Sequence, residues 1–176
     1  MKLRTQRLTL RPPALADAAR VSLLAGEYEV ASMTATIPYP YSEKLAAEWI
    51  GEVSRGEEGV VFMIEQGGKI VGCTGYRAFG RDHAELGYWI AKPFWGKGYA
   101  TEAVSALIAH AFDMDGFDYL LAGYFSDNPA SARVIEKLGF VAQGGELRGC
   151  VARGTSAHCT TARLDRDQAM ALFQSA

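Results

Sequence analysis

Two glycines, Gly96 and Gly98, stand one residue apart between a strand-like segment and a helix-like segment. The segment before them, His83–Ile90, alternates polar and apolar residues and then becomes fully apolar, which is typical of a strand that enters a core. The segment after them, Tyr99–Asp113, repeats apolar residues at helical spacing. Because such a helix packs back onto the sheet, this order predicts a crossover unit in a mixed α/β fold. The expected buried face of the helix consists of Val104, Leu107, Ile108, Ala111 and Phe112.

The glycine loop has the outline of an anion site. The first N–H groups of a helix have no partner within it, and the helix dipole adds positive potential. Glycines at 96 and 98 would let phosphate oxygens approach the backbone without meeting a side chain. The spacing is not that of a P-loop, because Ala91 stands where the first glycine should be and Gly98 follows Lys97. It also departs from the dinucleotide motif, which requires a glycine at Thr101. A nucleotide-phosphate enzyme is therefore the weaker alternative, and this segment alone favours phosphate binding and a plain turn equally.

Turn and cap residues divide the rest of the chain into short strands and helices. Gly67 and Gly68 predict a hairpin turn. Ser42 and Asn128 are expected helix N-caps, and Gly139 is an expected helix stop. The expected strands are Arg7–Pro13, Gly59–Gln66, Lys69–Arg77, His83–Ile90, Asp118–Phe125, Phe140–Glu146 and Ser156–Leu164. The expected helices are Ala14–Ala25, one that Ser42 begins, Tyr99–Asp113, one from Asn128 to Gly139, and a short one at the C-terminus.

Three of these elements carry a more specific expectation. The first strand ends at two prolines, which favours a sheet edge. The helix Ala14–Ala25 is expected to bury a face made of Leu15, Ala18, Ala19, Ser22 and Leu23. The helix after Ser42 is expected to bury Leu45, Trp49 and Val53.

The composition is that of an ordinary globular domain. The chain has 176 residues, 49% hydrophobic and 22% charged, with a net charge of −2. It suggests a single domain, residues 1–176, and argues against a nucleic-acid binder, which usually carries a basic excess. Three cysteines without a Cys-x-x-Cys pair suggest neither a disulfide framework nor a metal site. No apolar run approaches the ~20 residues that span a bilayer and no signal-peptide core is present, so we expect a cytoplasmic protein outside the membrane.

A second segment gives the glycine loop a context. "ELGYWI…WGKGYATEA", followed by "NPASARVIEKLGF", resembles the GNAT superfamily of N-acetyltransferases. Trp95 replaces the usual first residue of the family loop, and "TQRLTLRPP" near the N-terminus is similar to a branch that includes the ribosomal-protein alanine N-acetyltransferases. The resemblance runs to about Glu146, and the tail beyond "GGELRG" (Gly144–Gly149) is less informative. It implies an α/β GNAT fold with a mixed, mostly antiparallel sheet of six to seven strands, splayed at its centre and flanked by about four helices.

The resemblance implies acetyl-CoA as cosubstrate and no metal. In the family the coenzyme pyrophosphate lies on loop amides and the pantetheine arm pairs with the end of the preceding strand. Mapped onto this sequence, the implied cofactor residues are Tyr88, Trp89, Ile90, Trp95, Gly96, Lys97, Gly98, Ala100, Thr101, Asn128, Ser131 and Arg133. Several carry a second interpretation: a solvated side chain for Lys97 and Arg133, core packing for Tyr88 or Trp89, and helix capping for Asn128.

The implied activity is acetyl-CoA-dependent transfer to a primary amine, either a protein N-terminus or a small molecule, by direct attack in a ternary complex. Glu85 is the candidate base, with a surface carboxylate as the alternative. Many members of the family use a tyrosine as general acid. That position holds Ile135 in this sequence, so Ser131 is the candidate general acid. Tyr39, Tyr41 and Glu85 are candidates for holding the acceptor, whereas Trp49 is assigned to core packing. A non-catalytic coenzyme-A sensor is the alternative function, and monomer and homodimer both stay open.

Overall fold

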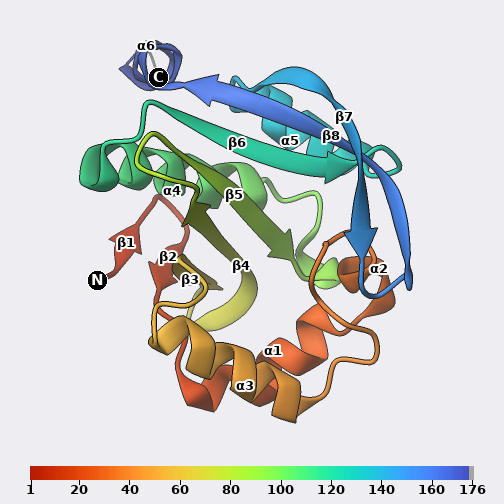
Figure 1. Ribbon diagram of the computed structural model, residues 1–176. Coiled ribbons are helices and arrows are strands. Elements are labelled where there is room, and N and C mark those ends of the chain that lie inside the picture. The colour runs from red at the N-terminus through yellow and green to blue at the C-terminus, as the bar shows by residue number, and fades with distance from the viewer. Residues whose placement is uncertain (175–176) are drawn as a thin grey trace.

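The computed structural model describes residues 1–174, which form one eight-stranded sheet with helices on both faces (Figure 1). The strands are β1 (Leu3–Arg4), β2 (Thr9–Arg11), β3 (Val60–Gln66), β4 (Lys69–Ala78), β5 (His83–Ile90), β6 (Tyr119–Phe125), β7 (Val141–Cys150) and β8 (Thr155–Asp165). The helices are α1 (Ala18–Ala25), α2 (Tyr28–Ala31), α3 (Glu43–Ser54), α4 (Tyr99–Asp115), α5 (Pro129–Lys137) and α6 (Arg166–Gln174). The strand order is β1-β2-β3-β4-β5-β6-β8-β7, and every neighbouring pair is antiparallel except β5 and β6. The one parallel pair is the crossover that α4 connects, as the glycine segment predicted.

Two hydrophobic cores lie on opposite faces of the sheet. Helices α4 and α5 cover one face, and α1 and α3 cover the other. Strand alternation sorts the residues, since Phe62 and Ile64 join the core of α4 while Met63 joins that of α1. The whole expected face of α4 is buried, with each side chain at most 2% exposed. Because both faces are covered, a ligand has to enter where the strands separate.

The helix caps and turn glycines expected from the sequence are confirmed. The Ser42 side chain accepts a hydrogen bond from the Leu45 amide, and the Asn128 side chain accepts one from the Ser131 amide. Gly67 and Gly68 have φ of 57° and 77° in the β3–β4 turn, and Gly139 has φ of 88° just after α5. Side-chain caps and left-handed glycines depend on a few neighbouring residues, so they can be predicted locally.

The edges of the sheet differ from expectation. The sheet has eight strands because Leu3 and Arg4 add β1 outside β2, so the proline-terminated strand is internal rather than an edge. Pro12 and Pro13 lie beyond the last paired residue, Arg11, and cost no ladder bond. Strand β7 extends to Cys150 rather than ending near Glu146, and the short helix α2 was not expected.

The buried faces of α1 and α3 agree with expectation only in part, at Ala18 and, by partial burial, at Trp49. In α1 the buried residues are Ala18, Val21, Leu24 and Ala25, while Leu15 and Leu23 are 68% and 63% exposed. Leu15–Asp17 forms a 3-10 turn, so helical spacing begins only at Ala18 and the stripe shifts around the helix. In α3 the buried residues are Ala46 and Ile50, and Leu45 is 41% exposed. Small residues at these contacts let the two helices approach each other and the sheet closely.

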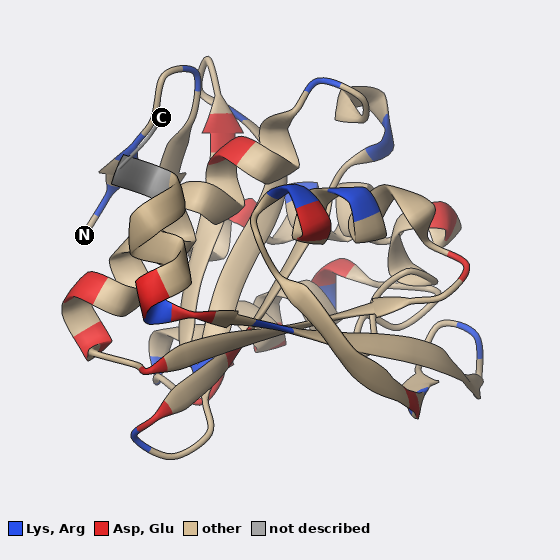
Figure 2. Cartoon of the chain, turned by 90° about the horizontal axis from the view of Figure 1, so that it is seen from above, with Lys and Arg blue, Asp and Glu red and all other residues tan. Residues whose placement is uncertain are grey.

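Charged residues of both signs are interspersed over the chain and do not gather on one face (Figure 2). Many form ion pairs, for example Arg11 with Asp17 and Glu65. In the described part of the chain, no helix has both the length and the apolar character needed to cross a bilayer.

Candidate functional site

Strands β5 and β6 separate halfway along their length. They pair only from His83 opposite Tyr119 to Leu86 opposite Ala122. Beyond that point β5 stays paired with β4 as far as Ile90, and β6 stays paired with β8 as far as Phe125. The two strands therefore diverge like the arms of a V, which is visible where β5 and β6 fan apart in Figure 1.

The diverging end of β5 directs backbone groups into this gap. The Ala91 amide donates to the Val71 carbonyl at 2.9 Å, which orients the groups of residue 91 toward β4. Since backbone groups alternate along a strand, those of Tyr88 and Ile90 point the other way, toward β6. The Trp95 indole N–H donates to the Ile90 carbonyl at 2.6 Å. The N–H and C=O of Tyr88 and the N–H of Ile90 are left facing the gap.

The glycine loop follows at the same end of the sheet. Gly96 and Gly98 have φ of 73° and 77°, a conformation that favours glycine. Gly98 is the N-cap of the 17-residue helix α4 and supplies no capping side chain. A side chain built at Gly96 would meet no atom within 4 Å, so the space above the loop is open. The arrangement is a backbone cradle suited to an anion.

The gap and the loop open into one cleft of about 1290 Å³. Most of the residues singled out from the sequence line it: Tyr41, Trp49, Glu85, Tyr88, Trp89, Ile90, Trp95, Gly96, Gly98, Ala100, Thr101, Asn128, Ser131, Ile135 and Arg133. Tyr88 packs on the α4 core and Trp89 on the α1 core, as expected for alternate residues of a strand. Trp49 combines its expected packing with a place in the cleft wall.

Lys97 and Tyr39 lie outside the residues that line the cleft. The Lys97 ammonium is 5.2 Å from the centroid of the Phe94 ring, and the residue is exposed. Tyr39 is 54% exposed and packs edge-on against Tyr28, with ring centroids 5.1 Å apart. Of this pair, Tyr28 lines the cleft and Tyr39 does not.

A tyrosine–serine pair crosses the gap. The Tyr88 hydroxyl and the Ser131 Oγ are 2.8 Å apart, and either can donate the hydrogen bond. Burial raises the pKa of the Tyr88 phenol to about 12, while its bond to Ser131 opposes the shift. Asn128 fixes Ser131 from the other side by accepting from its backbone N–H at 3.1 Å. The sequence did not indicate this pair, because the partners are 43 residues apart.

Glu85 is in an ion pair with Arg148, a residue that was not singled out from the sequence. Arg148 also binds Glu146 at 2.7 Å. Burial disfavours its charge, but the bonds to the two carboxylates raise its pKa above the ordinary arginine value. No local motif marks Arg148, and its partner Glu85 lies 63 residues away in the sequence.

Most acidic residues of the cleft are neutralised. The ion pairs are Glu29 with Lys92, Glu58 with Arg77, Glu85 with Arg148 and Asp127 with Arg153. Glu52 is the acidic lining residue that has no ion pair with any of residues 1–174. Arg133 and Lys137, one turn apart on α5, are lining residues whose charges are likewise unpaired within that range.

The tip of the β7–β8 hairpin holds the segment after α2, whose residues Ser32 and Ala35 line the cleft. The Arg153 Nε donates to the Ser32 carbonyl at 2.7 Å, and the Val151 amide donates to the Ala35 carbonyl at 3.0 Å. These bonds join the hairpin to the segment after α2, and Figure 1 shows the two side by side. The hairpin thus supports part of the cleft wall from outside the lining. Within the described chain, no three His, Cys, Asp or Glu residues come together as a metal site.

Comparison with known proteins gives matches over most of the chain. Residues 7–141 match the family model described as "Acetyltransferase (GNAT) domain". The uncharacterized N-acetyltransferase YoaA of Bacillus subtilis (strain 168) is 31% identical over 115 residues, which cover 64% of this chain and 59% of that protein. The uncharacterized N-acetyltransferase p20 of Bacillus licheniformis is 26% identical over 148 residues, covering 81% and 83%. Among solved structures, the ribosomal L7/L12 alpha-N-protein acetyltransferase RimL in complex with coenzyme A superposes with a TM-score of 0.83 at 17% identity, over 96% of this chain and 99% of that one. That match shows a shared fold.

Proposed function

The chain belongs to the GNAT acetyltransferase family, and on that premise we propose that it transfers an acetyl group from acetyl-CoA to a primary amine. One observation carries the proposal. The unpaired end of β5 and the glycine cradle at the start of α4 open into the same cleft. They are separated only by the short connection between β5 and α4. An elongated ligand with amides at one end and phosphates at the other can use both.

The residues of the cleft fit coenzyme A. Its pyrophosphate would lie on the loop and helix amides from Gly96 to Thr101, and the space above Gly96 is open to receive it. Its pantetheine amides would pair with the backbone groups of Tyr88 and the N–H of Ile90, since a buried polar group left unpaired is costly. The unpaired charge of Arg133 is available to a further phosphate. The thioester supplies an activated acetyl carbonyl beside β5.

The amine nitrogen attacks the thioester carbonyl carbon, so that a C–N bond forms as the C–S bond breaks. The nitrogen gives up one proton and the sulfur takes one up. Glu85 is the proposed acceptor of the nitrogen's proton. Because one of its oxygens is held by Arg148, the proton reaches Glu85 at the other oxygen or through a water.

Ser131 is the proposed proton donor to the departing sulfur, its oxygen regains a proton from water in the cleft, and Tyr88 positions it. A phenol with a raised pKa keeps its proton and can donate to the Ser131 oxygen. The Ser131 proton is then free to point into the cleft. Ile135 occupies the position where the family has its general-acid tyrosine. It is 2% exposed and has no polar side-chain atom, so it cannot donate a proton.

The paired charges favour an acceptor with a single amine, such as a protein N-terminus, over a polyamine. A polyamine needs several uncompensated carboxylates, and in the described chain only Glu52 among the lining acids lacks an ion pair. RimL, by its printed name, acts on a protein N-terminus, which supports the same choice.

The proposal is tested by an acceptor screen that measures free thiol released from acetyl-CoA, with N-terminal peptides and small amines side by side. Coenzyme A should first stabilise the protein against heat, by about 2.7 kcal/mol at ~100 times Kd. Binding without turnover on any amine would favour a non-catalytic coenzyme-A sensor. No thermal shift at millimolar coenzyme A would refute the proposed function.

Glu85→Gln should lower kcat/KM by roughly 100-fold, because an amide cannot accept the proton. Glu146→Gln is the matched control, since it removes the other carboxylate partner of Arg148 from outside the cleft lining. We expect the control to stay within about threefold of wild type. An unchanged kcat/KM and pH profile in Glu85→Gln would show that the base assignment is wrong.

A further inference from the structure

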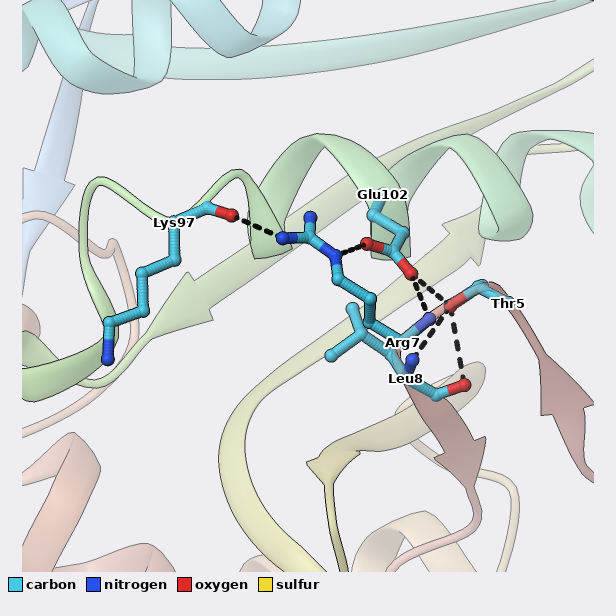
Figure 3. A network of polar contacts seen from close by, with 5 residues as sticks. All are labelled: Thr5, Arg7, Leu8, Lys97 and Glu102. Carbon is cyan, nitrogen blue, oxygen red and sulfur yellow. Dashed lines mark hydrogen bonds and ion pairs between the residues drawn. The ribbon is translucent and has the colours of Figure 1, made fainter.

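Arg7 joins the N-terminal segment to the glycine loop, about 90 residues away in the sequence (Figure 3). Its Nε donates to Glu102 Oε2 at 2.7 Å, and its Nη1 donates to the Lys97 carbonyl at 3.0 Å. Its guanidinium also lies 5.0 Å from the centroid of the Tyr99 ring. One side chain thus contacts the loop, the first helical residue and the first turn of α4.

The bond to Lys97 sets the orientation of one peptide group. In a trans peptide the C=O and the following N–H point in opposite directions. Because the Lys97 carbonyl points at Arg7, the Gly98 N–H points away from Arg7. Gly98 lines the cleft and Lys97 does not, so this N–H is turned toward the cleft side of the loop. A side chain built at Gly98 would approach Arg7 Nη2 to 3.4 Å, which places the guanidinium directly behind the loop.

The second contact neutralises a carboxylate that would oppose an anion. Glu102 lies in the first turn of α4, directly after Thr101, the last residue whose amide is proposed to hold the pyrophosphate. Besides Arg7 Nε it accepts from the Arg7 amide at 2.8 Å and from the Thr5 hydroxyl at 2.5 Å. Partial burial works against its charge, but these bonds hold the pKa of Glu102 below its ordinary value. The carboxylate is therefore ionised, and Arg7 is the cation that offsets it.

We propose that Arg7 is a positioning residue for the coenzyme site: it holds the Gly98 N–H toward the pyrophosphate and offsets the charge of Glu102. The inference rests on the proposed function, because it assumes a phosphate-bearing ligand on this loop. It adds the first segment of the chain to the coenzyme site, although none of residues 1–8 lines the cleft.

Arg7→Gln should weaken coenzyme A binding by about tenfold, the value of one charge-assisted hydrogen bond to a phosphate. Calorimetry with coenzyme A measures this without turnover. With acetyl-CoA the loss should appear in KM, while kcat and the KM of the acceptor stay within about twofold. Acetylpantetheine, which lacks the pyrophosphate, should be used with unchanged kcat/KM. A merely structural role would not separate these two acyl donors.

Arg163→Gln is the matched control. Arg163 has a similar exposure, 38% against 46% for Arg7, and likewise combines an ion pair, with Asp165, and an aromatic contact, with Tyr119. It does not line the cleft, so its loss should leave coenzyme A affinity unchanged.

Four outcomes decide the inference. Unchanged coenzyme A affinity in folded Arg7→Gln, an equal loss with acetylpantetheine, or an equal loss in Arg163→Gln would each overturn it, while leaving the proposed function standing. Failure of the wild type to bind coenzyme A would refute both. If Arg7→Gln does not fold, Arg7→Lys takes its place. It should lose coenzyme A affinity by less than tenfold, since one ammonium can bind the Glu102 carboxylate or the Lys97 carbonyl but not both.

Discussion

Gly96→Val is expected to reduce coenzyme A affinity by at least about 100-fold, or about 2.7 kcal/mol. Gly96 has φ of 73° and open space above it, where the proposed pyrophosphate oxygens lie. A valine would fill that space with two methyl groups and would resist the left-handed conformation. Either effect removes the close approach of phosphate to backbone amides. Titration calorimetry with coenzyme A measures the loss directly.

Gly68→Val separates ligand exclusion from backbone strain. Gly68 has φ of 77° in the β3–β4 turn, and a side chain built there also meets no atom within 4 Å. Both variants should lose roughly 1–2 kcal/mol of unfolding free energy, visible as a lower Tm. Only Gly96→Val should lose coenzyme A binding. Similar coenzyme A affinities in the two variants would contradict the assignment of the loop as the phosphate site.

Ser131→Ala is expected to lower kcat by about 100-fold and to leave the Kd for coenzyme A within about twofold. The variant removes the proposed proton donor and keeps the Asn128 cap, which binds the backbone N–H of residue 131. Tyr88→Phe should lower kcat by about tenfold, because Ser131 keeps its hydroxyl but loses its orientation. The double variant should be no slower than Ser131→Ala, since Tyr88 acts only through Ser131. Single-turnover rates at saturating acetyl-CoA measure the effect.

Tyr124→Phe is the control for Tyr88→Phe. Tyr124 lines the same cleft from β6, and its hydroxyl has no hydrogen bond to the described residues. The Tyr124→Phe variant should keep near-wild-type kcat.

The pH dependence of kcat gives a further check. Since the pKa of Tyr88 is raised to about 12, its proton is retained, and kcat should show no alkaline decline from this group between about pH 7 and about pH 10. Additive losses in the double variant would contradict the serine–tyrosine pair.

The strand, glycine loop and helix were predictable because their signals are local. Gly96 and Gly98 take the left-handed conformation that only glycine adopts freely, and the expected face of α4 is fully buried. The same locality explains the correct caps at Ser42 and Asn128. Where a 3-10 turn shifted the start of α1, periodicity alone chose the wrong face, with Leu15 and Leu23 exposed.

The side-chain partners of the site were not predictable in this way. No motif marks Arg148, which reaches Glu85 across 63 residues. The Tyr88–Ser131 bond and the Arg7 bond to Lys97 join segments 43 and 90 residues apart. The order of the strands in the sheet brings these partners together in space, and no sequence motif around either partner indicates the contact.

By itself, the sequence determined the family, the crossover unit and the backbone cradle of this protein. The cradle and the crossover unit depend on neighbouring residues, where backbone conformation follows from glycine, capping side chains and apolar spacing. The family depends on several such segments taken together. Only the tertiary structure decided which side chains meet around the candidate site: Arg7 and the Lys97 carbonyl, Tyr88 and Ser131, and Arg148 and Glu85. Such contacts form when distant strands pair in a given register, and the register is a property of the whole sheet.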